Sequence, residues 1–153
     1  MDVTDRENMG WHVDARNRLA LPGIHDATLE ALAYRPARGL ALRIPGQGGE
    51  RTSIGFERVH RTNLCDLWEQ AIVDSIFVWD DAAVPEADWA QGDIGWRALL
   101  AGRTGLGRDA RASAADLVRA HPGATLATVS CAYGGSLSVL CEAVRIQQTR
   151  RTR

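Results

Sequence analysis

The chain contains no lysine, because all 18 of its basic residues are arginine. Without a lysine amine, Schiff-base catalysis, a P-loop lysine and a lysine general base are excluded. Cysteine is also scarce: there are three, and no two are spaced as Cys-x-x-Cys. Three cysteines cannot all pair with one another, so the sequence predicts reduced, buried thiols.

Long apolar runs are missing too, and no stretch approaches the roughly 18 residues of a membrane-spanning helix. The opening segment, MDVTDRENMG, lacks the basic and apolar regions of a secretion signal. We therefore expect a cytoplasmic protein without a membrane partner. The net charge of −1 gives no reason to expect nucleic acid as a partner. The length predicts a single domain over residues 1–148, followed by a basic, frayed tail at 149–153.

Glycine and proline divide the chain into short segments, which favours strands. Residues 26–35 match both a helix and a strand. Residues 40–44 (LALRI) alternate apolar side chains, and the short turn before them favours a hairpin. Residues 53–59 (SIGFERV) are predicted as a third strand with Ile54 and Phe56 facing inward, and residues 75–79 (SIFVW) as another.

Two short helices and a C-terminal hairpin complete the prediction. Residues 96–102 (WRALLAG) match a short helix, and residues 113–123 match a second with Ser113 as its N-cap. Residues 125–144 predict a hairpin with a two-residue turn at Gly134 and Gly135, in which Cys131 faces Ser138. The predicted fold class is α+β: an antiparallel sheet of about five or six strands with one or two short helices.

The neighbouring His25 and Asp26 are the first candidate site. Adjacent residues on a strand point to opposite faces, and on a helix they diverge by about 100°, so joint catalysis or metal binding is disfavoured. We expect Asp26 to bond nearby backbone amides and His25 to pack at a sheet edge. The four histidines show no metal-ligand spacing. The sequence thus predicts no catalytic residue, no cofactor and no bound metal.

A second candidate is the acidic stretch, residues 79–96, which holds five acids between 80 and 93 without a basic residue. Acids speed encounter with a basic surface, and tryptophans are favoured as interface anchors. The alternative is a solvated loop whose tryptophans fold back over the core. The predicted partner-binding residues are Trp79, Asp80, Asp81, Glu86, Asp88, Trp89 and Asp93.

Residues 23–80 resemble small β-rich immunity-like families of bacterial polymorphic toxin systems. The resemblance consists of a short His-Asp-Ala motif at the start of a hairpin and a third strand of Ile-x-Phe-x-x-Val type. The matching residues are His25, Asp26, Ala27, Leu29, Leu32, Tyr34, Leu42, Ile54, Phe56 and Val59. The resemblance implies a non-enzymatic cytoplasmic protein that binds and neutralises a cognate toxin.

The sequence therefore favours a non-enzymatic protein-binding module, whose partner is a protein such as a toxin with a basic surface. Two alternatives belong to other classes. One is a small metal-dependent hydrolase using His25, Asp26 and His60, which requires the two histidines to converge in a pocket. The other is a β-rich small-molecule binder with a pocket lined by tryptophans. The oligomeric state is not predicted.

Overall fold

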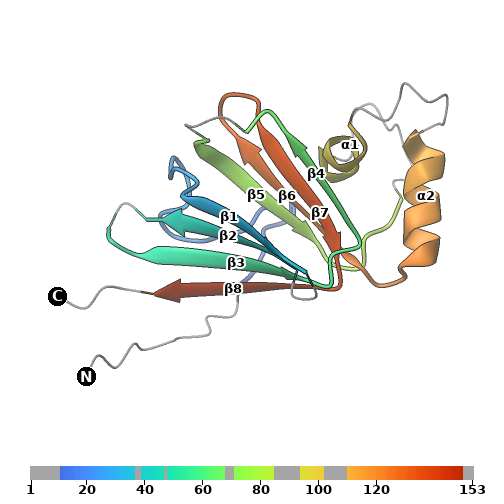
Figure 1. Cartoon of the computed structure of the whole chain (residues 1–153), viewed down its shortest axis with the longest axis horizontal. Coiled ribbons are helices and arrows are strands. Elements are labelled where there is room, and N and C mark those ends of the chain that lie inside the picture. The colour runs from blue at the N-terminus through green and yellow to red at the C-terminus, as the bar shows by residue number, and fades with distance from the viewer. Residues whose placement is uncertain are drawn as a thin grey trace.

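A computed structural model of the chain describes residues 11–36, 39–46, 48–67, 71–84, 94–101 and 110–149. The described part forms two four-stranded antiparallel sheets and two helices (Figure 1). The first, sheet 1, has the strand order β1 (Ala31–Arg35), β2 (Gly39–Pro45), β3 (Arg51–Glu57) and β8 (Ala143–Thr149). The second, sheet 2, has the order β4 (Arg61–Cys65), β7 (Ser136–Cys141), β6 (Thr125–Cys131) and β5 (Val73–Trp79). The helices are α1 (Ile94–Leu100) and α2 (Ala110–Ala120).

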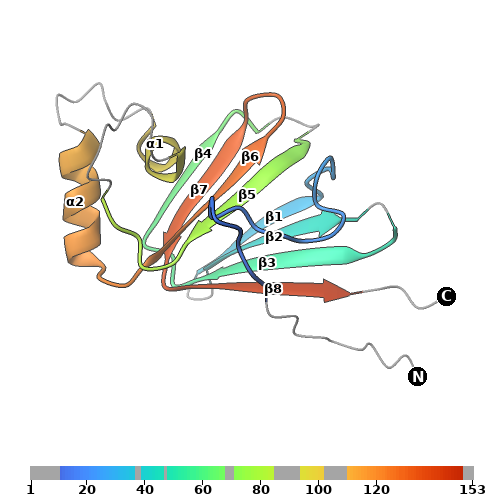
Figure 2. The same ribbon diagram turned by 180° about the vertical axis from the view of Figure 1, so that it is seen from behind.

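The two sheets are joined at one corner. β3 continues through residues 58–60 into β4, and β7 continues through Glu142 into β8, so two paired segments pass together from one sheet to the other. At this corner the Glu142 amide donates to the Glu57 carbonyl at 3.0 Å, and the guanidinium of Arg58 pairs with the Glu142 carboxylate. The sheets meet at this end and diverge away from it (Figures 1 and 2).

The larger core cluster fills the space between the sheets. Residues of β2, β3 and β8 alternate between buried and more exposed, as expected for strands with one covered face. Ile54 and Phe56 are each 1% exposed, which confirms their predicted inward orientation. Their cluster includes the following residues from both sheets: Leu42, Ile44, Ile146, Val73, Val78, Val129 and Val139.

Sheet 2 is covered on both faces, and β6 and β7 are therefore buried along nearly their whole length. A second cluster packs Trp96 and Leu99 of α1 and Ala114 of α2 against Leu126 and Leu140 of the sheet. In both ribbon views the helices lie on the side of sheet 2 that faces away from sheet 1 (Figures 1 and 2). The layers of the described part are thus sheet 1, sheet 2 and the helices, and neither described helix covers the outer face of sheet 1.

The segment before β1 runs along β5 and occupies its backbone edge. The Leu19 amide donates to the Ile76 carbonyl at 2.7 Å, and the Asp26 amide donates to the Val73 carbonyl at 2.9 Å. In the same way the Val78 amide donates back to this segment. These bonds satisfy groups that an edge strand would otherwise leave open to other chains.

The general class of the predicted fold is confirmed, but the prediction of one sheet with five or six strands is wrong. The chain has two sheets and eight described strands. Two strands were missed. β4 (RTNLC) has no buried residue, and β8 carries Gln148 at an inward position. The Gln148 amide is satisfied there by the Pro22 carbonyl and the Thr52 hydroxyl, which an alternation pattern cannot reveal. β8 extends to Thr149, the first residue of the predicted tail, and residues 150–153 lie outside the described part.

Two local predictions are corrected. In the C-terminal hairpin Ser130 pairs with Ser136, and Ser138 faces Thr128 instead of Cys131, so the turn is longer than two residues. Its conformation uses Gly134 at a φ of 92°, where glycine is tolerated. Helix α2 begins at Ala110, so Ser113 lies inside it and is not the N-cap. The strand prediction for β1 and the hairpin with β2 are confirmed.

Candidate functional site

Three of the seven predicted partner-binding residues lie in the described part: Trp79, Asp80 and Asp81. The other four, Glu86, Asp88, Trp89 and Asp93, lie outside it. Asp80 and Asp81 are exposed at the end of β5. The Thr125 hydroxyl donates to the Asp80 carboxylate at 3.1 Å, which holds this carboxylate against the start of β6.

The two described tryptophans of the acidic stretch lie where α1 packs on sheet 2. Trp96 is fully buried, and its indole N–H donates to the Ala83 carbonyl at 3.0 Å. Trp79 is half-buried and stacks on Phe77 with ring centroids 5.7 Å apart. Gly95 of α1 lies directly over the Trp79 ring, so both indoles help to seat α1 on the sheet. Among the tryptophans of this stretch, the anchor hypothesis now depends mainly on Trp89.

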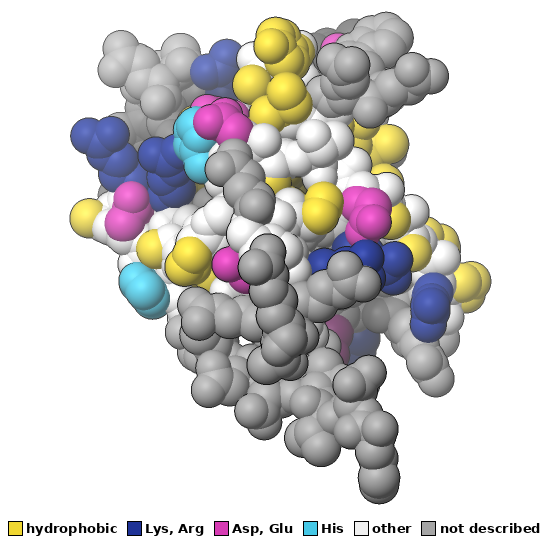
Figure 3. All heavy atoms as spheres, turned by 90° about the vertical axis from the view of Figure 1, so that its left-hand side faces the viewer, with side chains coloured by type: hydrophobic (Ala, Val, Ile, Leu, Met, Phe, Trp, Pro, Cys, Tyr) yellow, Lys and Arg dark blue, Asp and Glu magenta, His cyan; other side chains and the backbone are white. Residues whose placement is uncertain are grey.

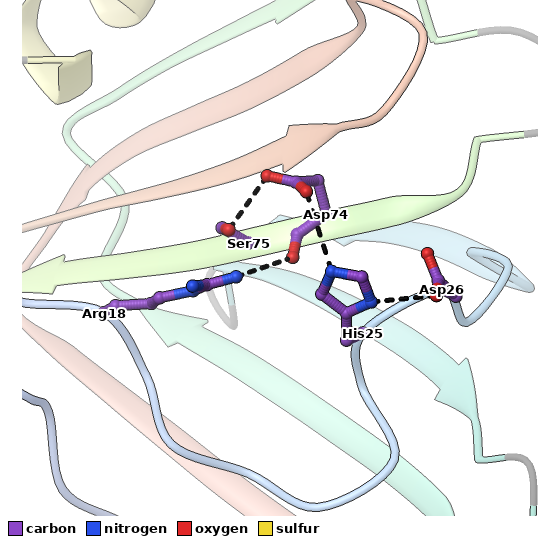
Figure 4. Close-up of polar contacts among 5 residues, drawn as sticks. All are labelled: Arg18, His25, Asp26, Asp74 and Ser75. Atoms are coloured by element: carbon purple, nitrogen blue, oxygen red, sulfur yellow. Dashed lines mark hydrogen bonds and ion pairs between the residues drawn. The ribbon is translucent and has the colours of Figure 1, made fainter.

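His25 and Asp26 contact each other, contrary to the expectation that their side chains point apart. The His25 Nδ1 atom lies 2.9 Å from Oδ2 of Asp26 (Figure 4). Asp26 has a φ of 63°, a left-handed conformation that neither a strand nor a helix provides. The prediction failed because it assumed regular backbone, whereas both residues lie in a turn before β1.

The other nitrogen of His25 faces a second carboxylate, on β5. Its Nε2 atom lies 3.8 Å from Oδ1 of Asp74 (Figure 4). The Ser75 hydroxyl donates to the Asp74 carboxylate at 2.9 Å, and the Arg18 guanidinium donates to the Asp74 carbonyl at 3.4 Å. A protonated His25 can thus donate to Asp26 on one side and face Asp74 on the other. Because 61% of the His25 side chain is exposed, these contacts add little to stability, and the backbone hydrogen bonds of Leu19 and Asp26 hold the N-terminal segment on β5.

The structure does not bring His25 and His60 together. His25 borders a hollow of about 250 Å³ beside β5, whereas His60 borders a separate hollow of about 310 Å³ with His121 and Glu142. Within the described ranges no group of three or more histidine, cysteine, aspartate or glutamate residues is placed to hold a metal ion. The convergence that the hydrolase alternative requires is therefore not found.

The outer face of sheet 1 carries a hollow of about 370 Å³ that sequence reasoning did not identify. Its floor is a row of small residues paired across three strands, Ala33 with Ala41 and Ala41 with Gly55. On one side of this row lies Arg43, opposite Ala31 on β1, and on the other side lies Arg35, opposite Gly39 on β2. Short side chains on these strands make the concavity, and arginines border it.

This outer face is strongly basic within the described part. It carries four arginines, at positions 35, 43, 51 and 145, and one acid, Glu57. Arg145 pairs with Glu57 at 2.5 Å, and no carboxylate of the described ranges pairs with Arg35, Arg43 or Arg51. Arginine and acidic side chains lie side by side at the end of the molecule viewed in Figure 3. The signal in the sequence was the placement of arginine between inward apolar residues, as in LALRI and VRIQ.

Comparison of the chain with models of known protein families, with curated proteins and with solved structures finds no match. Neither described helix has the length and apolar character needed to cross a membrane.

Proposed function

We propose that this chain is a cytoplasmic, non-enzymatic protein-binding module of the immunity type, which neutralises a cognate toxin by covering part of its surface. The observation that carries the proposal is the outer face of sheet 1, which no described helix covers and where Arg35, Arg43 and Arg51 have no described acidic partner. Arginine is favoured in protein interfaces, because its guanidinium forms bidentate bonds with carboxylates.

The other main surfaces of the described part are covered, which supports the outer face of sheet 1 as the binding surface. The opposite face of the molecule is covered by α1 and α2, and the edge of β5 is covered by the N-terminal segment. Of the two described sheets, sheet 1 is the one that keeps a broad face of polar and small side chains on a buried core. Rigid elements hold binding side chains more accurately than loops do.

The acidic stretch is a second proposed docking surface, for a partner with a basic face. Asp81 and Asp80 are its described acids, and they lie at the end of β5 in sheet 2. The two surfaces carry opposite charge. Reversing charges on one surface at a time therefore shows which of them the partner contacts.

Co-expression with a toxin tests the function directly. The reading frame immediately upstream of this gene would be examined for a toxin domain; that domain would be expressed in a bacterial host, with and without the chain, and growth would be measured. We expect the chain to restore growth and the doubly reversed Arg43→Glu, Arg51→Glu variant to lose this protection. Arg119→Glu on α2, which is exposed and belongs to neither surface, is the matched control.

Three outcomes are informative against the proposal. If the wild-type chain does not restore growth or bind the toxin, the immunity assignment is wrong. If Asp81→Arg abolishes protection and the arginine reversals do not, docking occurs on the acidic stretch. If Arg119→Glu has the same effect as the double reversal, the loss reflects overall charge and not a surface.

A further inference from the structure

We propose that the occupant of the outer face of sheet 1 is an acidic segment of the partner in extended conformation, which adds as a strand to the free edge of β1. The inference rests on the proposed function, because it names the chemistry of the protein that would dock there. Three features of the described residues carry it: an open strand edge, two arginines at a defined spacing, and exposed apolar side chains on the opposite face of the same strand.

β1 is the edge of sheet 1 and pairs with β2 alone in the described part of the chain. No backbone bond to its other edge is found there, in contrast to β5, whose edge is bonded to the N-terminal segment. Four of the five β1 residues are exposed. An edge strand leaves alternate N–H and C=O groups unpaired, and an extended peptide can satisfy them by pairing as the next strand.

The arginines set the spacing of acids in such a segment. Arg43 on β2 pairs directly with Ala31 on β1. Arg35 lies four residues after Ala31 on the same face of β1, with Ala33 between them. A strand added beside β1 would face these positions with every second residue. Carboxylates at positions i and i+4 of the segment would therefore face Arg43 and Arg35. Because Ala31 is small, it leaves the path from Arg43 to the strand edge open.

The other face of β1 adds an apolar requirement. Leu32 is 38% exposed and Tyr34 is 69% exposed, and both point to the face opposite to Arg35. The alternating residues of an added strand would cover them. The preferred segment is thus acidic at i and i+4 on one face and apolar at the positions between, on the other face. This is a two-sided pattern, which neither a nucleic acid nor a free anion can match.

A synthetic peptide tests the inference with the purified full chain and without the toxin. The probe is a fluorescein-labelled nine-residue peptide with glutamate at its third and seventh positions, threonine at the other odd positions and valine at the even ones. The matched control has the same composition with one glutamate moved to the sixth position, which places the two acids on opposite faces. Binding is measured by fluorescence anisotropy at low ionic strength.

We expect the first peptide to bind and the control to bind about tenfold more weakly, which corresponds to about 1.4 kcal/mol. Arg43→Gln and Arg35→Gln should each weaken binding of the first peptide by about fivefold to tenfold, whereas Arg119→Gln on α2 should not. N-methylation of the peptide backbone should abolish binding for one of the two alternate sets of residues, odd or even, because only every second N–H faces β1 and donates in strand pairing. Unchanged thermal midpoints of the variants would show that their folds are intact.

Several results would overturn the inference. Equal binding of the two peptides would contradict the i, i+4 spacing, and binding that survives N-methylation of each alternate set in turn would contradict strand addition. Tight binding of a labelled oligothymidylate that Arg43→Gln abolishes would show phosphate recognition instead. Protection from the toxin that depends on Arg43, without binding of the peptide, would leave the proposed function standing and this inference wrong. Binding of the peptide without protection would support the site and remove the immunity role.

Discussion

The imidazole rings of His60 and His121 stack with centroids 3.8 Å apart and planes inclined by 12°. His60 lies at the corner between β3 and β4, and His121 follows the end of α2, so the stack ties the helical layer to the corner where the sheets join. The Nε2 atom of His60 also lies 3.9 Å from a Glu142 oxygen. Burial lowers the pKa of His60, and the adjacent His121 and Arg58 lower it further, against an opposing effect of Glu142.

Stability should therefore depend on His60 below neutral pH. In the unfolded chain the pKa of this histidine is near its ordinary 6.5, and folding lowers it. The contribution to stability is fully present above pH 6.5 and is lost as pH falls towards the lowered pKa, since the unfolded chain then binds the extra proton. Urea midpoints measured from about pH 7.5 to about pH 5 should fall less in His60→Gln than in the wild type. His12→Gln, at an exposed position, is the control and should show the pH dependence of the wild type. An equal change of the urea midpoint with pH in His60→Gln and His12→Gln would contradict the role of His60.

The three thiols should differ sharply in reactivity. Burial raises the pKa of Cys141 to about 12 and also raises the pKa of Cys131. The thiolate is the reactive form, so both should resist a disulfide reagent in the folded protein at neutral pH. Cys65 is only half-buried on β4. In the folded wild-type protein we expect one thiol to react readily, and in folded Cys65→Ser none. In denaturant all three thiols of the wild type should react. Fast reaction of a thiol in folded Cys65→Ser would contradict the burial of Cys131 and Cys141.

Gly95→Ala should destabilise the protein although alanine is the better helix former. An added Cβ would lie 2.6 Å from the Trp79 ring and 2.7 Å from the Leu126 side chain, distances that force α1 away from sheet 2. Overpacking of this kind costs about 1–3 kcal/mol. Chemical denaturation should show the loss, and Ala112→Gly at an exposed position of α2 calibrates helix propensity alone, which is worth about 1 kcal/mol. A gain of stability in Gly95→Ala would show that α1 does not sit as described.

A buried hydroxyl pair should couple the hairpin to α1. The Thr128 and Ser138 hydroxyls lie 2.8 Å apart, and the Ser138 hydroxyl donates to the Gly95 carbonyl at 3.0 Å. Ser138→Ala should cost about 1–3 kcal/mol, because it leaves buried polar groups unsatisfied. Ser53→Ala on the exposed face of sheet 1 is the matched control. The loss in the double variant Thr128→Val, Ser138→Ala should be smaller than the sum of the single losses; simple additivity would show that the two hydroxyls act separately.

Apolar alternation in the sequence predicted β2 and β3, whereas β4 and β8 were missed. β2 and β3 were recognised because Leu42, Ile44, Ile54 and Phe56 alternate with polar or small residues. β4 was missed because none of its residues is buried, and β8 because the inward Gln148 breaks the apolar pattern. The hairpin was found, but its predicted register was wrong because the loop between Ser130 and Ser136 is longer than two residues.

The candidate sites depended even more on tertiary structure. The tryptophan-rich stretch was visible in the sequence, but only the packing of α1 shows that Trp96 is buried. The contact of His25 with Asp26 depends on one left-handed residue. Each arginine of sheet 1 could be identified in the sequence, but their positions relative to one another on the outer face follow from the pairing of four strands.

The sequence by itself excluded catalysis that needs a lysine, because the chain has none. It also predicted reduced cysteines and the inward faces of β2 and β3. These are local properties, set by residue identity and by the two-residue period of a strand. Only the tertiary structure decided which outer face no described helix covers, which strand edges carry no described backbone bond and which side chains from distant segments meet. Those properties depend on how sheets and helices stack. The alternation within one strand indicates which of its faces is polar, but it does not indicate which element packs over that face.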